Sequence, residues 1–344
     1  MSIGLDKVTQ HRPVTAERLL AFCKASADPL RLNILCVLSM ESFGVLELGR
    51  VFSVPQPGMS HHLKILTAAG LLETRREGNS IFYRRSLIAA ENPLGRLQQS
   101  LFESVDRITL PEGIQEALVN VQKERAAHSM LFFQKNADKF KQNQDLIANF
   151  SQYSQGAQDL IGNEKLPRDA TVMEVGPGDG DLLLYLGNLF DRVIALDNSA
   201  EMLEKARQSV AAENLRNVEF LQGELDLALQ REIKVDLLVL NMVLHHLASP
   251  AEVFKQAQLL LNEGGCFSVI DLCSHNQDWT RDSCGDIWLG FDPDDLDNWA
   301  DNACLSRGQS VYLGLRNGFQ IQMRLFHNRS SADLNSDRLT VKPQ

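Results

Sequence analysis

The stretch TVMEVGPGDGDLLLYL, residues 171–186, decides the fold of the larger part of this chain. An apolar, strand-like run ends in Gly176-Pro177-Gly178-Asp179-Gly180, and a helical pattern begins directly behind it. Glycines between a strand and a helix let the backbone approach a ligand where a Cβ atom would collide. The spacing is G-x-G-x-G, which differs from the G-x-G-x-x-G of dinucleotide-binding enzymes.

Further strand patterns follow this stretch, and helical patterns separate them. The strand candidates are residues 171–176, 191–197, 218–222, 235–241 and 266–272. Strands that alternate with helices predict an α/β doubly wound, Rossmann-like parallel sheet. An acidic, helix-like region covers residues 285–303, with Asp292-Pro293 typical of a helix N-terminus, and a late antiparallel hairpin is expected at 309–316 and 319–327.

Polar residues stand where these strands end. Asp197 closes the second strand, 17 residues after Gly180. A carboxylate at this place can accept hydrogen bonds from both hydroxyls of a ribose and would repel a 2′-phosphate. Glu224 and Leu225 follow the third strand, beside the expected place of an adenine amino group, and Asn241 ends the fourth. An ordered set of this kind is more informative than a glycine loop alone.

The set resembles class I S-adenosylmethionine (SAM)-dependent methyltransferases, especially the small-molecule group that includes the UbiE type, over about residues 165–275. The resemblance implies SAM or S-adenosylhomocysteine (SAH) as ligand and no metal cofactor. The implied cofactor-binding residues are Glu174, Gly176, Gly178, Gly180, Asp197, Glu224, Leu225 and Asn241. NAD binding, or a fold that has lost its ligand, are the alternatives.

Candidates for a catalytic base are His245, His246 and Asp271, although the structural interpretation of the two histidines, as packing and hydrogen-bonding groups, is the simpler one. The fourth strand lacks the Asn/Asp-Pro-Pro-Tyr/Phe loop that holds a planar amino group, which disfavours methylation of nucleic-acid bases. Arsenic methyltransferases bind arsenic through clustered cysteines, and the spacing of the cysteines in this chain does not resemble theirs. The sequence therefore does not identify the molecule that would accept a methyl group.

The amino-terminal part follows another pattern. Helical periods cover residues 16–40, with a break at Asp28-Pro29, then 45–52 and 56–69, and strand patterns cover 71–76 and 80–86. Glu77-Gly78-Asn79 is a hairpin turn between the two strands. This order predicts a winged helix-turn-helix of the α+β class.

The helix expected at residues 56–69 has the chemistry of a DNA recognition helix. Its side chains that reach base edges or phosphates are Gln56, Ser60, His61 and Lys64, and the hairpin adds Arg75, Arg76, Arg84 and Arg85. Residues 1–104 hold 12 Lys and Arg against 9 Asp and Glu, a net charge of +3, whereas the whole chain carries −10. A mildly basic module on an acidic body fits local contact with DNA.

This part resembles the ArsR/SmtB family of dimeric repressors, through residues 27–35, 56–66, 69–72, 75–78 and Tyr83. The resemblance implies a homodimer on a two-fold, double-stranded DNA operator. Gly44 and Leu46 stand where many members carry the thiolates that sense metal, so we expect no metal at that place.

The organisation follows from these patterns. We expect a winged helix-turn-helix domain at residues 1–104, a helical connector or dimerisation region at 105–165, a methyltransferase-like domain at 166–330 and a disordered tail at 331–344. The first residues hold no apolar signal-peptide core, no run reaches the ~20 apolar residues of a membrane span, and the six cysteines contain no C-x-x-C pair. A cytoplasmic protein with reduced thiols and no membrane partner is therefore expected.

The two constellations together predict a transcriptional regulator whose methyltransferase-like domain senses SAM or SAH. An active methyltransferase acting on a small molecule, with the helix-turn-helix domain as its regulator, is the second hypothesis. An interaction protein with both sites vestigial is the third.

Overall fold

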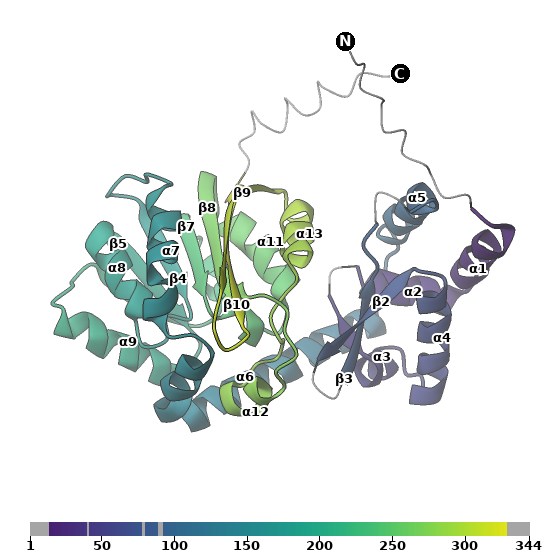
Figure 1. Cartoon of the computed structure of the whole chain (residues 1–344), viewed down its shortest axis with the longest axis horizontal. Helices are drawn as coiled ribbons and strands as arrows, with labels where there is room; N and C mark the ends of the chain where they lie inside the picture. The colour runs from purple at the N-terminus through teal and green to yellow at the C-terminus, as the bar shows by residue number, and fades with distance from the viewer. Residues whose placement is uncertain (1–13, 40, 78–79, 89–91, 329–344) are drawn as a thin grey trace, which may run out of the picture. The chain divides into compact units, whose positions relative to one another are not determined.

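The chain forms two compact units, residues 1–121 and 122–344, in a computed structural model that describes residues 14–39, 41–77, 80–88 and 92–328 (Figure 1). The expected turn at Gly78-Asn79 and the expected tail at 331–344 lie outside the described residues. The expected connector, residues 105–165, is divided between the two units. Within the described ranges, no helix is long and apolar enough to cross a membrane.

The first unit is a winged helix-turn-helix, as predicted. Its elements are α1 Ala16–Ser26, α2 Pro29–Val37, β1 Phe43–Gly44, α3 Val45–Val51, α4 Gln56–Ala68, β2 Leu72–Glu77, β3 Ser80–Arg85 and α5 Gly95–Val105. The predicted break at Asp28 is confirmed, because its side chain accepts a hydrogen bond from the Arg31 amide at 2.9 Å and Pro29 begins α2. The two-residue strand β1 was not expected; it pairs with β3 and gives a small sheet of order β1-β3-β2.

A long helix, α6 (Glu112–Ile147), runs through the boundary between the units. Val121 is buried in the core of the first unit, and Ile114 and Leu118 pack against that core. From Gln122 onward the helix belongs to the second unit, in which α7 (Phe150–Gly162) follows it.

The second unit is built on a sheet of seven strands in the order β6-β5-β4-β7-β8-β10-β9. The strands are β4 Thr171–Val175, β5 Arg192–Asp197, β6 Val218–Gln222, β7 Val235–Asn241, β8 Leu261–Leu272, β9 Leu305–Gly314 and β10 Gln320–Asn328. The first five in this order pair in parallel, and β10 and β9 form the antiparallel hairpin at one edge. The predicted doubly wound sheet with a late hairpin is therefore confirmed.

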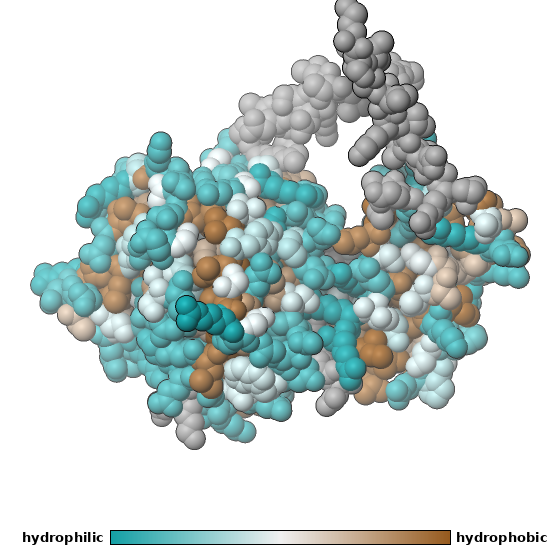
Figure 2. All heavy atoms as spheres, in the orientation of Figure 1, coloured by the Kyte–Doolittle hydropathy of each residue, from teal (hydrophilic) through white to brown (hydrophobic). Residues whose placement is uncertain are grey.

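Helices cover both faces of this sheet, as Figure 1 shows. One layer holds α7, α8 (Asp181–Leu189) and α9 (Ala200–Ala212); the other holds α10 (Leu225–Gln230), α11 (Pro250–Leu260) and α13 (Pro293–Asn302). Because both faces are covered, the central strands are almost continuously apolar and buried. In Figure 2 hydrophilic residues make up most of the visible surface of this unit, with smaller hydrophobic patches between them.

The acidic region at 285–303 is helical over a shorter stretch than expected. Gly285 and Gly290 have φ angles of 78° and 69°, which end the short helix α12 (Trp279–Cys284) and keep the next residues irregular. A Cβ atom at Gly290 would lie 2.2 Å from the Cys273 carbonyl oxygen. The helix α13 begins where Asp292-Pro293 predicted it.

Candidate functional site

The polar strand ends of the second unit lie along one edge of the sheet. The strands β6, β5, β4, β7 and β8 are parallel neighbours, so their carboxyl ends share that edge. The chain leaves β4 with β5 on one side and β7 on the other, which makes this the topological switch point where ligands bind in open α/β sheets. The cofactor-binding roles of the predicted residues stay predictions, but the topology brings them to one place.

The glycine loop needs its glycines. Gly176, Gly178 and Gly180 have φ angles of 64°, 58° and 89°, a region that other residues adopt only at a cost. A Cβ atom at Gly176 would lie 2.2 Å from Val243 Cγ2, whereas one at Gly178 would meet nothing within 4 Å. Gly176 is thus required by packing, and Gly178 leaves a bare stretch of backbone open to a ligand.

Glu174 supplies a buried and unsatisfied acceptor beside this loop. The residue is 1% exposed, and its Oε2 has no hydrogen-bond partner in the part of the chain that the structure describes. Burial, with a further contribution from Asp181, raises the pKa of Glu174 well above its usual range. An orphaned buried carboxyl is costly unless a donor pairs with it, which fits the ammonium group of an amino-acid ligand.

Asp197 lies at the carboxyl end of β5. One of its carboxylate oxygens accepts a hydrogen bond from the Ser199 amide at 2.8 Å, and burial raises its pKa to about 6 although the amides of Ser199 and Asn198 oppose that shift. On the neighbouring strand end, Leu225 is buried and Glu224 is exposed, and Glu224 accepts a hydrogen bond from the Asn198 side chain at 3.2 Å.

The histidines after β7 belong to a buried cluster of charges. His245 Nδ1 donates to Asp271 Oδ1 at 2.7 Å, and His245 Nε2 lies 3.7 Å from Asp286 Oδ1. His246 Nδ1 donates to the Gly285 carbonyl at 3.3 Å, and the two imidazole centroids are 4.0 Å apart. These four side chains are all less than 5% exposed.

The cluster separates the pKa values of its members. Burial alone lowers the pKa of His245, but the carboxylates of Asp271 and Asp286 outweigh it and raise that pKa to about 9. Burial and the charge of His245 lower the pKa of His246 well below its usual range, and burial raises that of Asp286 to about 6. His245 is therefore an imidazolium at neutral pH and, in this state, has no free lone pair with which to act as a base.

The part of α6 from Ser129 onward lies over this edge of the sheet. Ser129 Oγ donates to the His246 carbonyl at 3.1 Å, and the ring of Phe133 meets that of His246 edge-on at 5.0 Å. Lys141 Nζ lies 3.1 Å from Asp181 and 3.5 Å from Asp179, directly behind the glycine loop. One helix thus touches both the glycine loop and the loop that follows β7.

Two residues near the site were missed by the sequence-based reasoning. Tyr153, in α7, is buried, and its hydroxyl interacts with Asn241 and feels the charges of Glu174 and Asp271; burial raises its pKa, so it stays a neutral donor. Asp286 was counted only as part of the acidic, helix-like region at 285–303. Neither carries a sequence signal, because tertiary folding alone brings them to the site.

In the first unit, the recognition helix α4 presents the predicted polar face. Met59, Leu63 and Leu66 are fully buried, as their spacing predicts. The side chains predicted to contact DNA are exposed at Gln56, His61 and Lys64 and half-buried at Ser60. No acidic residue stands in the first turn of α4, so none opposes a phosphate at the positive end of the helix.

The four arginines of the hairpin differ in their surroundings. Arg85 donates to the Leu35 carbonyl at 2.7 Å and to Asp106 at 2.6 Å, and Arg84 lies 2.6 Å from Glu73. Arg75 is half-buried and Arg76 is exposed. The DNA contacts of all four arginines remain predictions.

Comparison with known proteins agrees with the two predicted domains. A family model described as a helix-turn-helix domain matches residues 27–75, and one described as a methyltransferase domain matches residues 166–303. The chain is 37% identical to the biofilm growth-associated repressor of Agrobacterium fabrum over 87 residues, which are 25% of this chain and 71% of that protein. It is 30% identical to a transcriptional repressor SmtB homologue of Synechocystis over 86 residues, 24% of this chain and 65% of that one.

The second unit has its own relatives. The chain is 29% identical to the tRNA 5-carboxymethoxyuridine methyltransferase of Escherichia coli K12 over 119 residues, which are 34% of this chain. It spans less than half, 46%, of that enzyme's length. The chain belongs to the ArsR/SmtB family of helix-turn-helix regulators, and it carries a methyltransferase domain fused behind its DNA-binding domain.

Proposed function

We propose that this protein is a DNA-binding regulator whose affinity for its operator depends on SAM or SAH bound at the carboxyl edge of the second unit. The observation that carries the proposal is the contact of α6 with that edge. The same helix supplies Val121 to the core of the DNA-binding unit. A ligand that displaces one half of a continuous helix acts on the other half through the backbone.

The site suits an adenosyl amino acid. The orphaned Oε2 of Glu174 fits the ammonium group, the bare backbone at Gly178 leaves room for the methionine part, and Asp197 fits the ribose hydroxyls. Bound SAM would supply an electrophilic methyl group, and SAH would occupy the same place without one. The residues on the page hold and orient either ligand.

Coupling requires that the ligand prefer one state of α6 over another, since only differential affinity shifts an equilibrium. Phe132 and Phe133 of α6 pack against Met202, at the start of the helix behind Asp197. Their rings therefore border the predicted ribose site from one side, while Lys141 holds the loop acids from another. Adenosyl binding would compete with, or tighten, these contacts, and either response biases α6.

A homodimer on a two-fold operator is part of the proposal. Leu19 and Leu20 of α1 and Leu97 of α5 are 40%, 53% and 42% exposed, which offers apolar surface for a second copy. A DNA-binding role would place the protein in the cytoplasm. Light scattering of the purified chain tests the dimer, because a monomeric mass at micromolar concentration contradicts it.

The experiment for the whole proposal is a DNA-binding titration. The full chain is titrated onto duplex DNA from upstream of its own gene, at fixed salt, without ligand and then with SAM and with SAH. A change in affinity on adding either ligand is expected. Asp197→Ala should lose that response, whereas the exposed Asp191, at the opposite end of β5, provides the matched control as Asp191→Ala.

A second candidate function is methyl transfer to a small molecule. The observation that favours it is the set of buried groups with shifted pKa values at this edge, Tyr153, His245 and Asp286, because such groups gather at active sites. The neutral Tyr153 hydroxyl is one group that could orient an acceptor. Labelled SAM incubated with cell extract and the protein tests this. Absence of a labelled product with wild type counts against methyl transfer, and an undiminished product with Tyr153→Phe counts against the role of Tyr153.

A further inference from the structure

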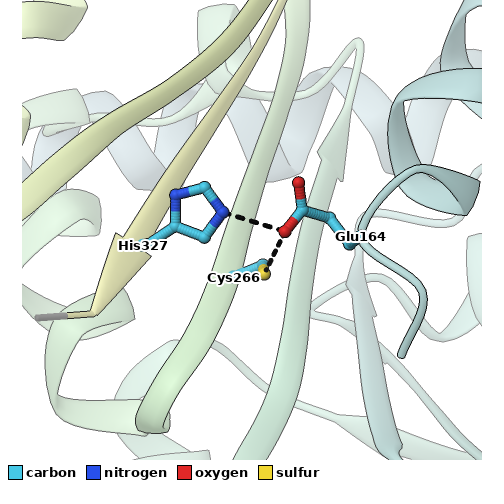
Figure 3. Close-up of side chains that lie close together, drawn as sticks. All are labelled: Glu164, Cys266 and His327. Atoms are coloured by element: carbon cyan, nitrogen blue, oxygen red, sulfur yellow. Dashed lines mark hydrogen bonds and ion pairs between the residues drawn. The ribbon is translucent and has the colours of Figure 1, made fainter. Parts of the chain in front are cut away.

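A second group of polar side chains lies away from the cofactor edge (Figure 3). Glu164 follows α7, Cys266 lies in β8 and His327 lies in β10. Glu164 Oε2 is 3.2 Å from Cys266 Sγ and 2.9 Å from His327 Nε2. The three side chains converge on one point although 163 positions separate the first from the last.

The sheet register places two of these residues together. His327 pairs directly with Cys266 on the neighbouring antiparallel strand, so both side chains project from the same face. Gly308 of β9 makes room for the imidazole, because a Cβ atom there would lie 2.5 Å from His327 Cε1 and 3.0 Å from Nδ1. The side of the ring that carries Cε1 and Nδ1 therefore lies against Gly308. Its Nε2 is directed at Glu164, as Figure 3 shows.

The group is remote from the glycine loop. Cys266 pairs with Leu237, near the start of β7, and Leu237 pairs with Val172, near the start of β4. The glycine loop follows the end of β4, at the opposite edge of the sheet. Among the described residues, none of the contacts given above for the predicted cofactor site involves these three.

The donor atoms are one sulfur, one imidazole nitrogen and one carboxylate oxygen, a set that zinc accepts. Ligands about 2.1 Å from a tetrahedral ion lie ~3.4 Å apart, and all three ligand atoms here lie within 4.8 Å of one another. We propose that Glu164, Cys266 and His327 form a binding site for a divalent transition-metal ion of the zinc type, with solvent as the fourth ligand.

The proton balance of binding is simple. The Cys266 thiol loses its proton to solvent when sulfur bonds to the ion, and His327 binds through the lone pair of Nε2 with its proton on Nδ1. Glu164 exchanges two accepted hydrogen bonds for one metal bond. Without an ion, one oxygen of Glu164 accepts hydrogen bonds from a weak thiol donor and from one imidazole donor. These two hydrogen bonds alone stabilise the convergence of the three side chains only weakly.

This proposal departs from the expectation, made from the sequence, that the protein binds no metal. A second buried group, His245, His246 and Asp286, also has metal-ligand spacing. It contains no sulfur. A thiolate signal therefore distinguishes the two places.

The test is a titration of the full, reduced, metal-free chain with Co²⁺ alone. A thiolate-to-cobalt charge-transfer band in the near ultraviolet is expected to saturate at one ion per chain, and Zn²⁺ should abolish it. Cys266→Ser should lose the band, and His327→Gln and Glu164→Gln should each weaken Co²⁺ binding by at least ~10–100-fold. Cys304→Ser, which alters an exposed cysteine, is the matched control and should titrate like wild type.

Thermal melting keeps the test independent of misfolding. Zn²⁺ should raise the melting temperature of wild type and of Cys304→Ser, but not that of Glu164→Gln, a conservative change at a partly exposed side chain. The proposal is overturned if wild type gives no charge-transfer band, or if Cys266→Ser gives the same band as wild type. An equal Zn²⁺-dependent rise in Glu164→Gln also contradicts it.

Discussion

Asp197→Asn should stabilise the ligand-free protein and abolish its response to SAH. Burial raises the pKa of Asp197 to about 6 from its ordinary value of 3.8. The folded state therefore binds a proton more tightly than the unfolded chain does, so stability falls as the pH rises from about 4 through 6. At neutral pH the ionised carboxylate works against the fold.

The magnitude follows from this difference of about two pH units, each worth ~1.4 kcal/mol. The ionised carboxylate lowers the free energy of unfolding by about 3 kcal/mol at neutral pH. An asparagine removes the charge and keeps one acceptor for the Ser199 amide, but its NH₂ group cannot accept from the Asn198 amide. The expected net gain is about 1–3 kcal/mol, or roughly 2–4 °C in melting temperature for each kcal/mol in a unit of this size.

The assay is thermal unfolding with and without saturating SAH. Wild type should gain ~2.7 kcal/mol at a ligand concentration 100 times its Kd, whereas Asp197→Asn should start higher and gain nothing. The control Asp191→Asn, an exposed carboxylate paired with Arg168, should stay within about 0.5 kcal/mol of wild type and keep the SAH response. A ligand-free variant less stable than wild type, or one that SAH still stabilises fully, would refute the reasoning.

Three other predictions concern different parts of the chain. Lys64→Ala should weaken DNA binding and reduce the slope of log affinity against log salt by about one; an unchanged slope means that Lys64 contacts no phosphate. His245 has a pKa raised to about 9, so the stability it contributes should be complete below about pH 6.5 and lost as the pH rises through 9; urea titrations at several pH values should show this loss in wild type and a flatter profile in His245→Gln. Gly176→Ala should fold poorly because its Cβ would lie 2.2 Å from Val243, while Gly178→Ala should fold at a cost of about 1 kcal/mol and lose SAH affinity in calorimetry; equal behaviour of the two variants would contradict the assigned roles of the two glycines.

The fold was largely predictable because its signals are local. Residues 218–222 and 235–241 are mainly apolar runs, and both strands begin and end where predicted. The break at Asp28-Pro29 and the helix start at Asp292-Pro293 rest on capping chemistry that acts within a few residues. Such features need no knowledge of distant contacts.

The remaining features depend on contacts that are distant in sequence. The helix α6 is only weakly amphipathic, so nothing in its sequence indicates that one part belongs to each unit. Asp286 joins His245 because the irregular stretch after Gly285 folds back, with the Trp288 amide donating to the His245 carbonyl at 3.1 Å. Cys266 and His327 meet only through strand register. The residues that connect the site to the rest of the molecule are therefore the ones that sequence patterns leave out.

The central claim is that ligand at the sheet edge and DNA at the recognition helix are energetically coupled. Fluorescence anisotropy of labelled operator DNA, measured at one salt concentration with and without saturating SAH, tests it most directly. The account predicts that SAH changes the Kd for DNA by ~5-fold or more in wild type, and not in Asp197→Ala. An unchanged Kd in wild-type protein that calorimetry shows to be saturated with SAH would contradict it.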